Sequence, residues 1–535
     1  MKYTSTRDPS KSYTFEQALC SGYAPDGGLF VPERLPDKIS PSTLQEWSKL
    51  DYVDLATSIL SLFLTTEEIP LQDLQRTIRV SLSGFHPPVV PVVKKNAPNP
   101  IFVVELFHGA TFCFKDLSLQ FVVQMLNYFA VKRKRRITLV VATTGDTGPA
   151  AVQAVEDCKS EYLGILVHYP EGQISEFQRK QLTTCTHEKI RVVAFQGGGD
   201  DMDAPIKNIM TDPTSQTEER FICGVNSYNI ARPLMQMVHF VWAYLRVVES
   251  LGIEAGNSGM CMHVLWLEFS WIEWKGRPNK IRIDFTLDVV LPTGAMGNMA
   301  GGYIAKQMGV PIGRMCAGVN VNDITHQAFS RGLVQRSSTM HTTMSEAINI
   351  QLPYNLERLL FYITDQNHEQ VKLWYQQLET GADRTMVLHG TPWFAKLQTE
   401  FGSAKVTDDE LCATLRQARK QLDYFADPNT AVAFCAAKKL GYCFQPSEDQ
   451  PASNSSNVVA IFATASACKF ESVMTIALGK DEWDTYVAHH FPSRGKETLL
   501  KSERPLIRYL AREGSTLQEN QVEWEAMTRN LIQEM

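Results

Sequence analysis

The stretch ELFHGATFCFKD (105–116) places a single lysine, Lys115, behind Phe107, Phe112 and Phe114. An ammonium group held out of water loses part of its preference for the charged form, and the free amine is a nucleophile toward carbonyl groups. The same pattern also fits a structural interpretation, in which Lys115 opens a helix after an aromatic strand. Asp116, the next residue, is expected to cap or orient that helix. The choice depends on which other groups the chain brings to this lysine.

A glycine-dense loop offers a place for a phosphate group. The segment PTGAMGNMAGG (292–302) follows an apolar run, and Gly294 and Gly297 allow a tight turn whose backbone amides face a ligand ahead of the next helix. The loop lacks the dinucleotide-binding fingerprint and an acidic partner at the expected distance. Taken alone, it fits a structural turn as well as an anion site.

Two further loops, ATTGDTGPAA (142–151) and NSYNIARPLMQ (226–236), are rich in side chains that form hydrogen bonds. Some of these groups can cap the following helix, and others can bind a small carboxylate or phosphate. In the loop 226–236, four polar side chains within seven residues exceed what one helix end requires, so we expect this loop to bind a ligand. The loop 142–151 fits helix capping and ligand binding equally well. The candidate residues are Thr143, Thr144, Asp146, Thr147, Asn226, Ser227, Asn229 and Arg232.

Apolar strand-like runs alternate with helix-like segments through the middle of the chain. Runs such as 101–107, 137–143 and 286–294 are apolar nearly throughout, which indicates an α/β fold with parallel sheets covered by helices on both faces. Open parallel sheets bind ligands at the carboxyl ends of their strands, where the loops described above and ATASACKF (463–470) begin. An amine nucleophile, a phosphate site and polar loops are together what pyridoxal 5′-phosphate (PLP) requires.

Composition narrows the class of protein. The chain has 535 residues, a net charge of −6 and 11 scattered cysteines without metal-ligand spacing. These features argue against a nucleic-acid partner and a metal site, and they are typical of reduced thiols in a cytoplasmic protein. Neither a signal peptide nor an apolar run long enough to cross a membrane is expected. The basic run KRKRR (132–136) is predicted to be a solvated helix end.

The length predicts several domains. We expect a mostly helical N-terminal domain at 1–95, an α/β domain with Lys115 at 96–235, a large α/β domain with the phosphate site at 236–480, and a helical tail at 481–535. An insertion near 256–285 contains three tryptophans, Trp266, Trp271 and Trp274. It fits a lid or partner surface and, equally, a variant insertion without a role.

Six ordered motifs resemble those of the threonine synthase family of the longer fungal and bacterial type, and especially its animal threonine synthase-like 2 group. The similarity spans nearly the whole chain, and the motifs are GYAPDGGLFVPE (22–33), FHGATFCFKD, ATTGDTGPAA, NSYNIARP, PTGAMGNMAGGYIAKQMGVPI and LPYNLERLLF. The resemblance implies PLP fold type II, as in the tryptophan synthase β subunit, with Lys115 carrying the internal aldimine. It implies that Gly294, Ala295, Met296, Gly297 and Asn298 bind the cofactor phosphate, and that Thr464 offers its hydroxyl to the pyridine nitrogen.

Departures from the family pattern bear on the reaction. The usual GNFGN loop reads GAMGN, and two positions that are commonly histidine hold Asn429 and Ser466. The loss of two histidines disfavours ordered addition of water. The resemblance therefore implies a phospho-lyase of amino-acid catabolism, which converts O-phosphohomoserine and O-phosphothreonine to α-ketobutyrate, ammonia and phosphate. A true threonine synthase and a non-catalytic interaction protein remain alternatives, and either a homodimer or a monomer is expected.

Overall fold

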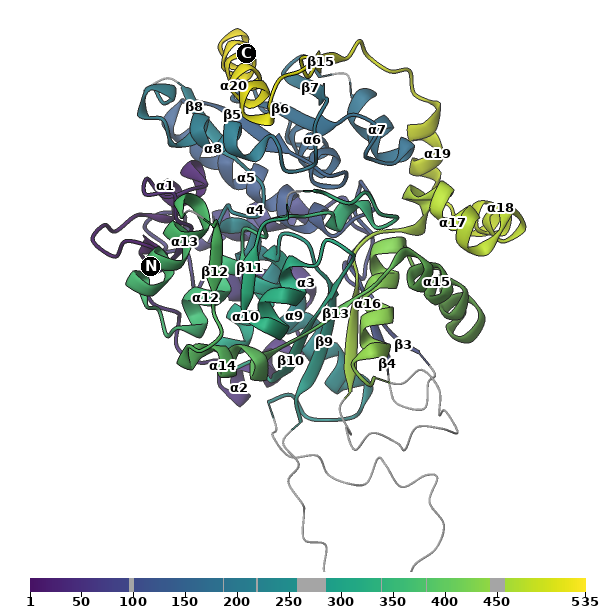
Figure 1. Cartoon of the computed structure of the whole chain (residues 1–535). Coiled ribbons are helices and arrows are strands. Elements are labelled where there is room, and N and C mark those ends of the chain that lie inside the picture. Colours follow the sequence, from purple (N-terminus) through teal and green to yellow (C-terminus); the bar gives the residue numbers. More distant parts are fainter. Residues whose placement is uncertain are drawn as a thin grey trace, which may run out of the picture.

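The computed structural model describes residues 1–95, 101–185, 187–217, 220–256, 285–337, 339–381, 383–442 and 458–535. The expected tryptophan-rich insertion lies almost entirely outside these residues. Two mainly parallel sheets dominate the described part, and in the view of Figure 1 the five-stranded sheet lies above the six-stranded one. This α/β arrangement confirms the fold class predicted from the apolar strands.

The six-stranded sheet has the order β13-β10-β9-β14-β4-β3. Its strands pair in parallel except β3, which runs antiparallel to β4 at one edge. The central strand β14 is buried along its whole length, as expected for a sheet covered on both faces. The strands are β3 (Val92–Lys95), β4 (Ile101–Glu105), β9 (Leu287–Pro292), β10 (Ile312–Val319), β13 (Phe401–Lys405) and β14 (Val459–Ala463).

The five-stranded sheet has the order β15-β7-β6-β5-β8 and is parallel throughout. Helices α5, α6 and α8 pack against its strands, and α20 covers α8. The strands are β5 (Arg136–Ala142), β6 (Leu163–Pro170), β7 (Ile190–Phe195), β8 (Arg220–Gly224) and β15 (Ile507–Tyr509). The helices of this half are α5 (Lys115–Arg133), α6 (Thr147–Cys158), α7 (Glu176–Thr183), α8 (Asp203–Thr211), the short η1 (Pro213–Ser215) and α20 (Leu517–Glu534).

The N-terminal segment is mostly helical, with one two-stranded antiparallel pair. Its helices pack on α5, α9 and β8. The elements are β1 (Tyr3–Ser5), α1 (Phe15–Ser21), β2 (Phe30–Pro32), α2 (Pro41–Trp47), α3 (Tyr52–Leu60) and α4 (Leu71–Leu82).

Helices α9 (Ala231–Ser250) and α10 (Gly297–Gln307) pack closely against each other. Gly301 permits this contact, because a Cβ there would lie 2.7 Å from the carbonyl oxygen of Pro233. The remaining elements are α11 (Ile324–Arg331), β11 (Leu333–Gln335), η2 (Glu346–Ile348), α12 (Leu356–Ile363), α13 (His368–Thr380), β12 (Thr385–Val387), α14 (Pro392–Glu400), α15 (Asp408–Leu422), α16 (Pro428–Lys439), η3 (Ala467–Lys469), α17 (Glu471–Leu478), α18 (Lys480–His489) and α19 (Ser493–Leu500).

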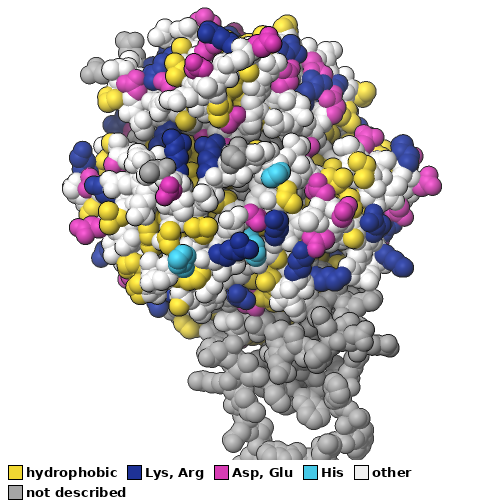
Figure 2. Space-filling view, viewed as in Figure 1, with side chains coloured by type: hydrophobic (Ala, Val, Ile, Leu, Met, Phe, Trp, Pro, Cys, Tyr) yellow, Lys and Arg dark blue, Asp and Glu magenta, His cyan; other side chains and the backbone are white. Residues whose placement is uncertain are grey.

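The sheets draw strands from distant parts of the chain. β4 joins the sheet of β9 and β14, and β15, from the tail expected to be helical, joins the other sheet. The domain boundaries therefore stay a prediction. The basic run is a helix end as expected, because α5 stops at Arg133 and Lys134 adopts a left-handed conformation. None of the helices in the described part of the chain has the length and apolarity to span a membrane. Figure 2 shows positive and negative side chains interspersed over the face that it views.

Candidate active site

One pocket opens at the carboxyl ends of strands from both sheets, as the loop argument predicts. Its walls come from the start of α5 and from the loops that follow β5, β7, β8, β9 and β14. Of the predicted site residues, the pocket walls include Lys115, Thr144, Asp146, Thr147, Asn226, Ser227, Arg232, Gly294, Ala295, Met296, Gly297, Asn298 and Thr464. Thr143 does not belong to this described lining. Its hydroxyl accepts hydrogen bonds from the amides of Gly145 (3.1 Å) and Gly148 (2.9 Å), so Thr143 shapes the loop from behind.

Lys115 is the first residue of α5 and reaches into the pocket. Its Nζ lies 3.2 Å from Asp146 Oδ2 and 4.8 Å from the ring centroid of Phe114. The side chain is only 13% exposed, and Phe112 is buried nearby in the chain. The Lys115 amine is therefore largely shielded from water, with an aromatic ring beside it.

Asp116, which was expected to cap or orient the following helix, instead fixes the loop before it. Its carboxylate accepts hydrogen bonds from the amide (2.7 Å) and the hydroxyl (2.6 Å) of Thr111. Burial raises the pKa of Asp116 to about 6, although these bonds favour the ionised form. A Cβ at Gly109 would lie 2.5 Å from Asp116 Oδ2, so this loop requires glycine.

Asp146 is a buried ion-pair centre and makes no side-chain cap to α6. Its Oδ1 accepts hydrogen bonds from Lys469 Nζ (2.6 Å) and Gln178 Nε2 (2.9 Å), while Oδ2 faces Lys115. Burial alone would raise the pKa of Asp146, but the Lys469 and Lys115 cations hold it well below its usual range. Lys469 is completely buried. No pattern in the sequence singled out Lys469 or Gln178, although Lys469 lies within the quoted segment ATASACKF.

The glycine loop forms a concave turn at the start of α10. Met296 adopts a left-handed conformation with φ of 61°, which turns the backbone before the helix amides begin. Asn298 accepts a hydrogen bond of 2.5 Å from Nε2 of the buried His239 through its Oδ1. Burial lowers the pKa of His239 to about 4, so the ring is neutral near pH 7 and donates. No sequence pattern singled out His239, which lies within an apolar helix.

Buried polar atoms without partners mark where a polar ligand fits. Among the described residues, Asn298 Nδ2, Gln236 Oε1, Asn226 Oδ1 and Asn429 Oδ1 have no hydrogen-bond partner, and all four residues line the pocket. Buried polar groups in folded proteins are normally paired. The backbone amides of the glycine loop and Asn298 Nδ2 suit a phosphate group, and the amine of Lys115, in the same pocket, suits a carbonyl group. The pocket therefore fits a ligand that has both groups.

The motif LPYNLERLLF holds the glycine loop and the 226–228 loop together. Asn355 Nδ2 donates to Ala295 O (3.1 Å) and to Ser227 Oγ (3.0 Å). The buried Arg358 donates to the carbonyls of Ser227 (3.0 Å) and Phe30 (3.1 Å). Asn355 and Arg358 were not in the predicted site, although two polar residues inside an apolar helical run are a usable signal.

Arg232, which was predicted to bind substrate, lines the pocket but directs its guanidinium elsewhere. It donates to Ser118 Oγ (2.8 Å) and to the carbonyl of Val225 (2.8 Å). Burial lowers its pKa to about 10. These contacts give Arg232 a role in positioning the loop that carries Asn226, whose Nδ2 donates to Ala142 O (2.7 Å).

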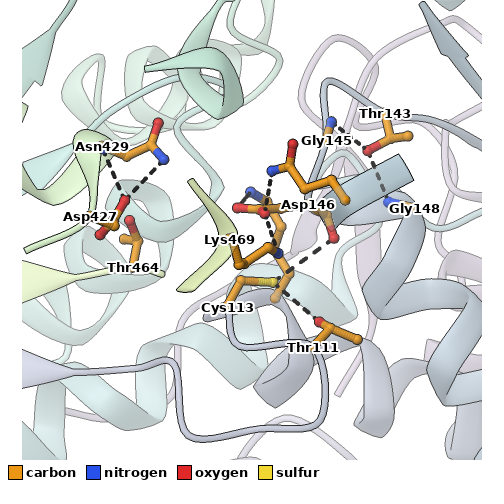
Figure 3. A network of polar contacts seen from close by, with 12 residues as sticks. Thr111, Cys113, Thr143, Gly145, Asp146, Gly148, Asp427, Asn429, Thr464 and Lys469 are labelled. Carbon is orange, nitrogen blue, oxygen red and sulfur yellow. Dashed lines mark hydrogen bonds and ion pairs between the residues drawn. The ribbon is translucent and has the colours of Figure 1, made fainter. Parts of the chain in front are cut away.

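Asn429 and Ser466, which stand where histidine is common in the family, lie in different environments. Asn429 lines the pocket, and its Nδ2 donates to Asp427 Oδ1 (3.0 Å), as Figure 3 shows beside Thr464. Ser466 is absent from the described lining of the pocket, and its hydroxyl contacts that of Tyr486 at 3.1 Å. The expectation that both lie at the reaction site therefore holds for Asn429 only.

Comparison with known proteins finds relatives that match most of the chain. The family described as threonine synthase N terminus matches residues 2–82. Threonine synthase-like 2 of Rattus norvegicus is 36% identical over 481 residues, which is 89% of each chain. The crystal structure of threonine synthase from yeast superposes with a TM-score of 0.79, at 28% identity over 98% of this chain and 99% of that one.

The structure of PLP-bound threonine synthase from Brucella melitensis has a TM-score of 0.76, at 26% identity over 98% of this chain and 99% of that one. The fold type expected from the ordered motifs is therefore confirmed. The chain belongs to the threonine synthase family, and its resemblance to the threonine synthase-like 2 proteins runs through most of its length.

Proposed function

We propose that the chain is a PLP-dependent phospho-lyase that acts on O-phosphohomoserine and O-phosphothreonine and releases α-ketobutyrate, ammonia and phosphate. The observation that carries the proposal is that Lys115 Nζ and the glycine loop 294–298 line the same pocket. PLP supplies an aldehyde for the lysine and an electron-withdrawing ring that stabilises negative charge at the substrate α-carbon. The PLP-bound relative from Brucella melitensis supports this choice of cofactor.

The residues of the chain divide the task by their chemistry. Lys115 provides the amine for the aldehyde, and the amides of 294–298 with Asn298 Nδ2 hold the phosphate at a helix N-terminus. Thr464, at the end of β14, offers a neutral hydroxyl to the ring nitrogen. A neutral hydroxyl does not enforce a protonated ring as a carboxylate does, so Lys115 Nζ carries more of the proton transfer at the substrate.

Substrate recognition falls to the polar loops after β5 and β8. Thr144 and Thr147 face the pocket beside Asn226 and Ser227, and these hydroxyl and amide groups suit a carboxylate and a phosphate. The lining also contains Asp200 and Asp203. Burial raises the pKa of Asp200 to about 6, so part of this acidic wall is protonated under mildly acidic conditions.

Elimination is favoured over water addition because of Asn429. An amide does not accept a proton near pH 7, so Asn429 cannot act as a base toward water, as a histidine at this place can. The true threonine synthase alternative rests on the family itself. If the chain is a threonine synthase, a group other than Asn429 activates the water, and the product is threonine.

A product assay tests the proposal. The purified chain with PLP is incubated with O-phosphohomoserine, and phosphate, threonine and α-ketobutyrate are quantified together; O-phosphothreonine is assayed in parallel. Phosphate with α-ketobutyrate is the expected result, and phosphate with threonine would establish the synthase. Lys115→Ala is the control, which should fold but release no phosphate and lose the visible absorbance of the bound cofactor. Absence of phosphate from both substrates would favour a non-catalytic role.

A further inference from the structure

Asp146 divides its carboxylate between two lysines that differ in freedom. Oδ1 is bound by Lys469 at 2.6 Å and by Gln178 at 2.9 Å, and Oδ2 is 3.2 Å from Lys115. Figure 3 shows Lys469 and Asp146 at the centre of this network. The carboxylate therefore keeps a fixed partner on one oxygen and a pocket-facing partner on the other.

Only one of the two lysines is placed to change partners. The side chain of Lys469 has no exposure and is absent from the described pocket lining, whereas Lys115 is 13% exposed and lines the pocket. A ligand in the pocket can reach Lys115 but not Lys469. When the Lys115 nitrogen turns to a ligand, Asp146 is left with Lys469 as its counter-ion, and the buried carboxylate is not stranded.

We propose that Lys469 is a positioning residue that, through Asp146, sets where the free Lys115 amine rests and how firmly the Asp146 carboxylate holds it there. Asp146 is the docking point for the Lys115 ammonium, and Lys469 balances the carboxylate so that this docking is reversible. The inference rests on the proposed function only for the identity of the ligand. The arrangement of Lys115, Asp146 and Lys469 does not depend on which ligand binds.

The direction of each effect follows from Coulomb interactions at short range. A carboxylate beside an amine favours its charged form, and a second ammonium nearby disfavours it. Without Lys469, Asp146 pairs only with Lys115 among the lysines that contact it in the described structure, so Lys115 keeps its proton to higher pH. Without Asp146, no carboxylate lies between the two lysines, and the Lys469 cation disfavours the charged form of Lys115.

Other titratable groups that face Asp146 do not change charge where lysines titrate. Burial and Asp146 raise the pKa of Glu346 to about 7, and burial raises that of Asp427 to about 6. Both are ionised above pH 8. Burial raises the pKa of the Cys113 thiol to about 11, so it stays protonated through most of the range. A shift of Lys115 with substitution at 469 is therefore not a secondary effect of these groups.

The test is a pH-dependent labelling of the cofactor-free chain. A small acylating reagent is applied between about pH 7 and 10.5, a range around the ordinary lysine value, and modification of Lys115 is quantified by peptide mass spectrometry. The exposed Lys134 serves as the internal reference. We expect the labelling midpoint of Lys115 to move up by about one pH unit in Lys469→Met and down by about one unit in Asp146→Asn, with Lys134 unchanged.

A double variant keeps the test decisive if Lys469→Met does not fold. Asp146→Asn/Lys469→Met removes both buried charges, and its Lys115 midpoint should lie above that of Asp146→Asn because the Lys469 cation is gone. Equal midpoints in these two proteins, or in Lys469→Met and the parent chain, would overturn the inference and leave Lys469 a packing residue. Lys480→Met, which removes an exposed lysine paired with Asp484, should leave the Lys115 midpoint in place.

The labelling experiment and the product assay can succeed or fail independently of each other. Labelling uses neither PLP nor substrate, so an inactive chain can still show the expected order of midpoints. Conversely, phosphate release with equal midpoints would retain the proposed function and reject the role of Lys469. A second readout is the pH dependence of PLP binding followed by visible absorbance, which should shift in the same direction as the labelling curve.

Discussion

Replacing His239 by glutamine should change how the stability of the chain depends on pH. Burial lowers the pKa of His239 from 6.5 to about 4, so the folded state disfavours the protonated ring. Its contribution to stability is fully present above pH 6.5 and is lost as the pH falls through 4. The shift corresponds to about 3 kcal/mol, at about 1.4 kcal/mol for each pKa unit. Glutamine does not titrate, so the variant should lose that much less stability between pH 6.5 and 4.

The same position should also control the phosphate site. Glutamine can donate to Asn298 Oδ1 as His239 does at 2.5 Å, whereas phenylalanine leaves that buried oxygen without a donor. An unpaired buried acceptor costs about 1–3 kcal/mol, which is about a fivefold to hundredfold loss in affinity when the cost falls on binding. His239→Phe should therefore weaken binding of PLP and of inorganic phosphate, and His239→Gln should largely retain both.

His168 provides a matched control. It is equally buried, and burial lowers its pKa to about 4 as well, but its Nε2 contacts Thr528 on α20 instead of the glycine loop. His168→Gln should flatten the pH dependence of unfolding, measured by urea titration at several pH values, without changing ligand affinity. Equal phosphate affinity in His239→Phe and the parent chain would refute the reasoning, as would an unaltered pH dependence in His239→Gln.

Three further substitutions test other parts of the fold and site. Gly301→Ala should destabilise the chain by about 1–3 kcal/mol in chemical unfolding, because its Cβ would lie 2.7 Å from Pro233 O; Gly84→Ala, with nothing within 4 Å, should change stability by less than about 0.5 kcal/mol. Arg358→Met removes the donor to several buried carbonyls and should cost at least about 3 kcal/mol together with PLP affinity; unchanged binding by fluorescence titration would argue against its role. Asn429→His should divert part of the O-phosphohomoserine product to threonine, and a product ratio that does not change would remove Asn429 as the cause of elimination.

The sequence was sufficient for the parts of the site that follow directly from local pattern. Lys115 and the glycine loop stand at strand-to-helix turns, and such turns in a parallel sheet meet at one edge. The sequence was not sufficient for groups that depend on distant packing. Lys469 contacts Asp146 across 323 residues, and His239 contacts Asn298 across 59, so neither pairing is visible as spacing.

Two local expectations were changed by tertiary contacts. Asp116 binds the preceding loop because Thr111 offers both an amide and a hydroxyl within reach, and the helix start does not compete for it. The three residues of β15 form a strand within an otherwise helical tail because they pair with β7 and become the edge of its sheet. Such a short strand has no periodicity of its own to reveal it.

The interleaving of early and late strands has a consequence for how the chain is made. β4 emerges from the ribosome long before its partner β14, and Lys469 follows Asp146 by 323 residues. At about 5–20 residues per second, synthesis of that stretch takes roughly 15–65 s. Throughout this time one edge of the apolar strand β4 has no neighbour, and open strand edges promote aggregation. The nascent chain should therefore depend on chaperones that shield its first half until β14 has been synthesised.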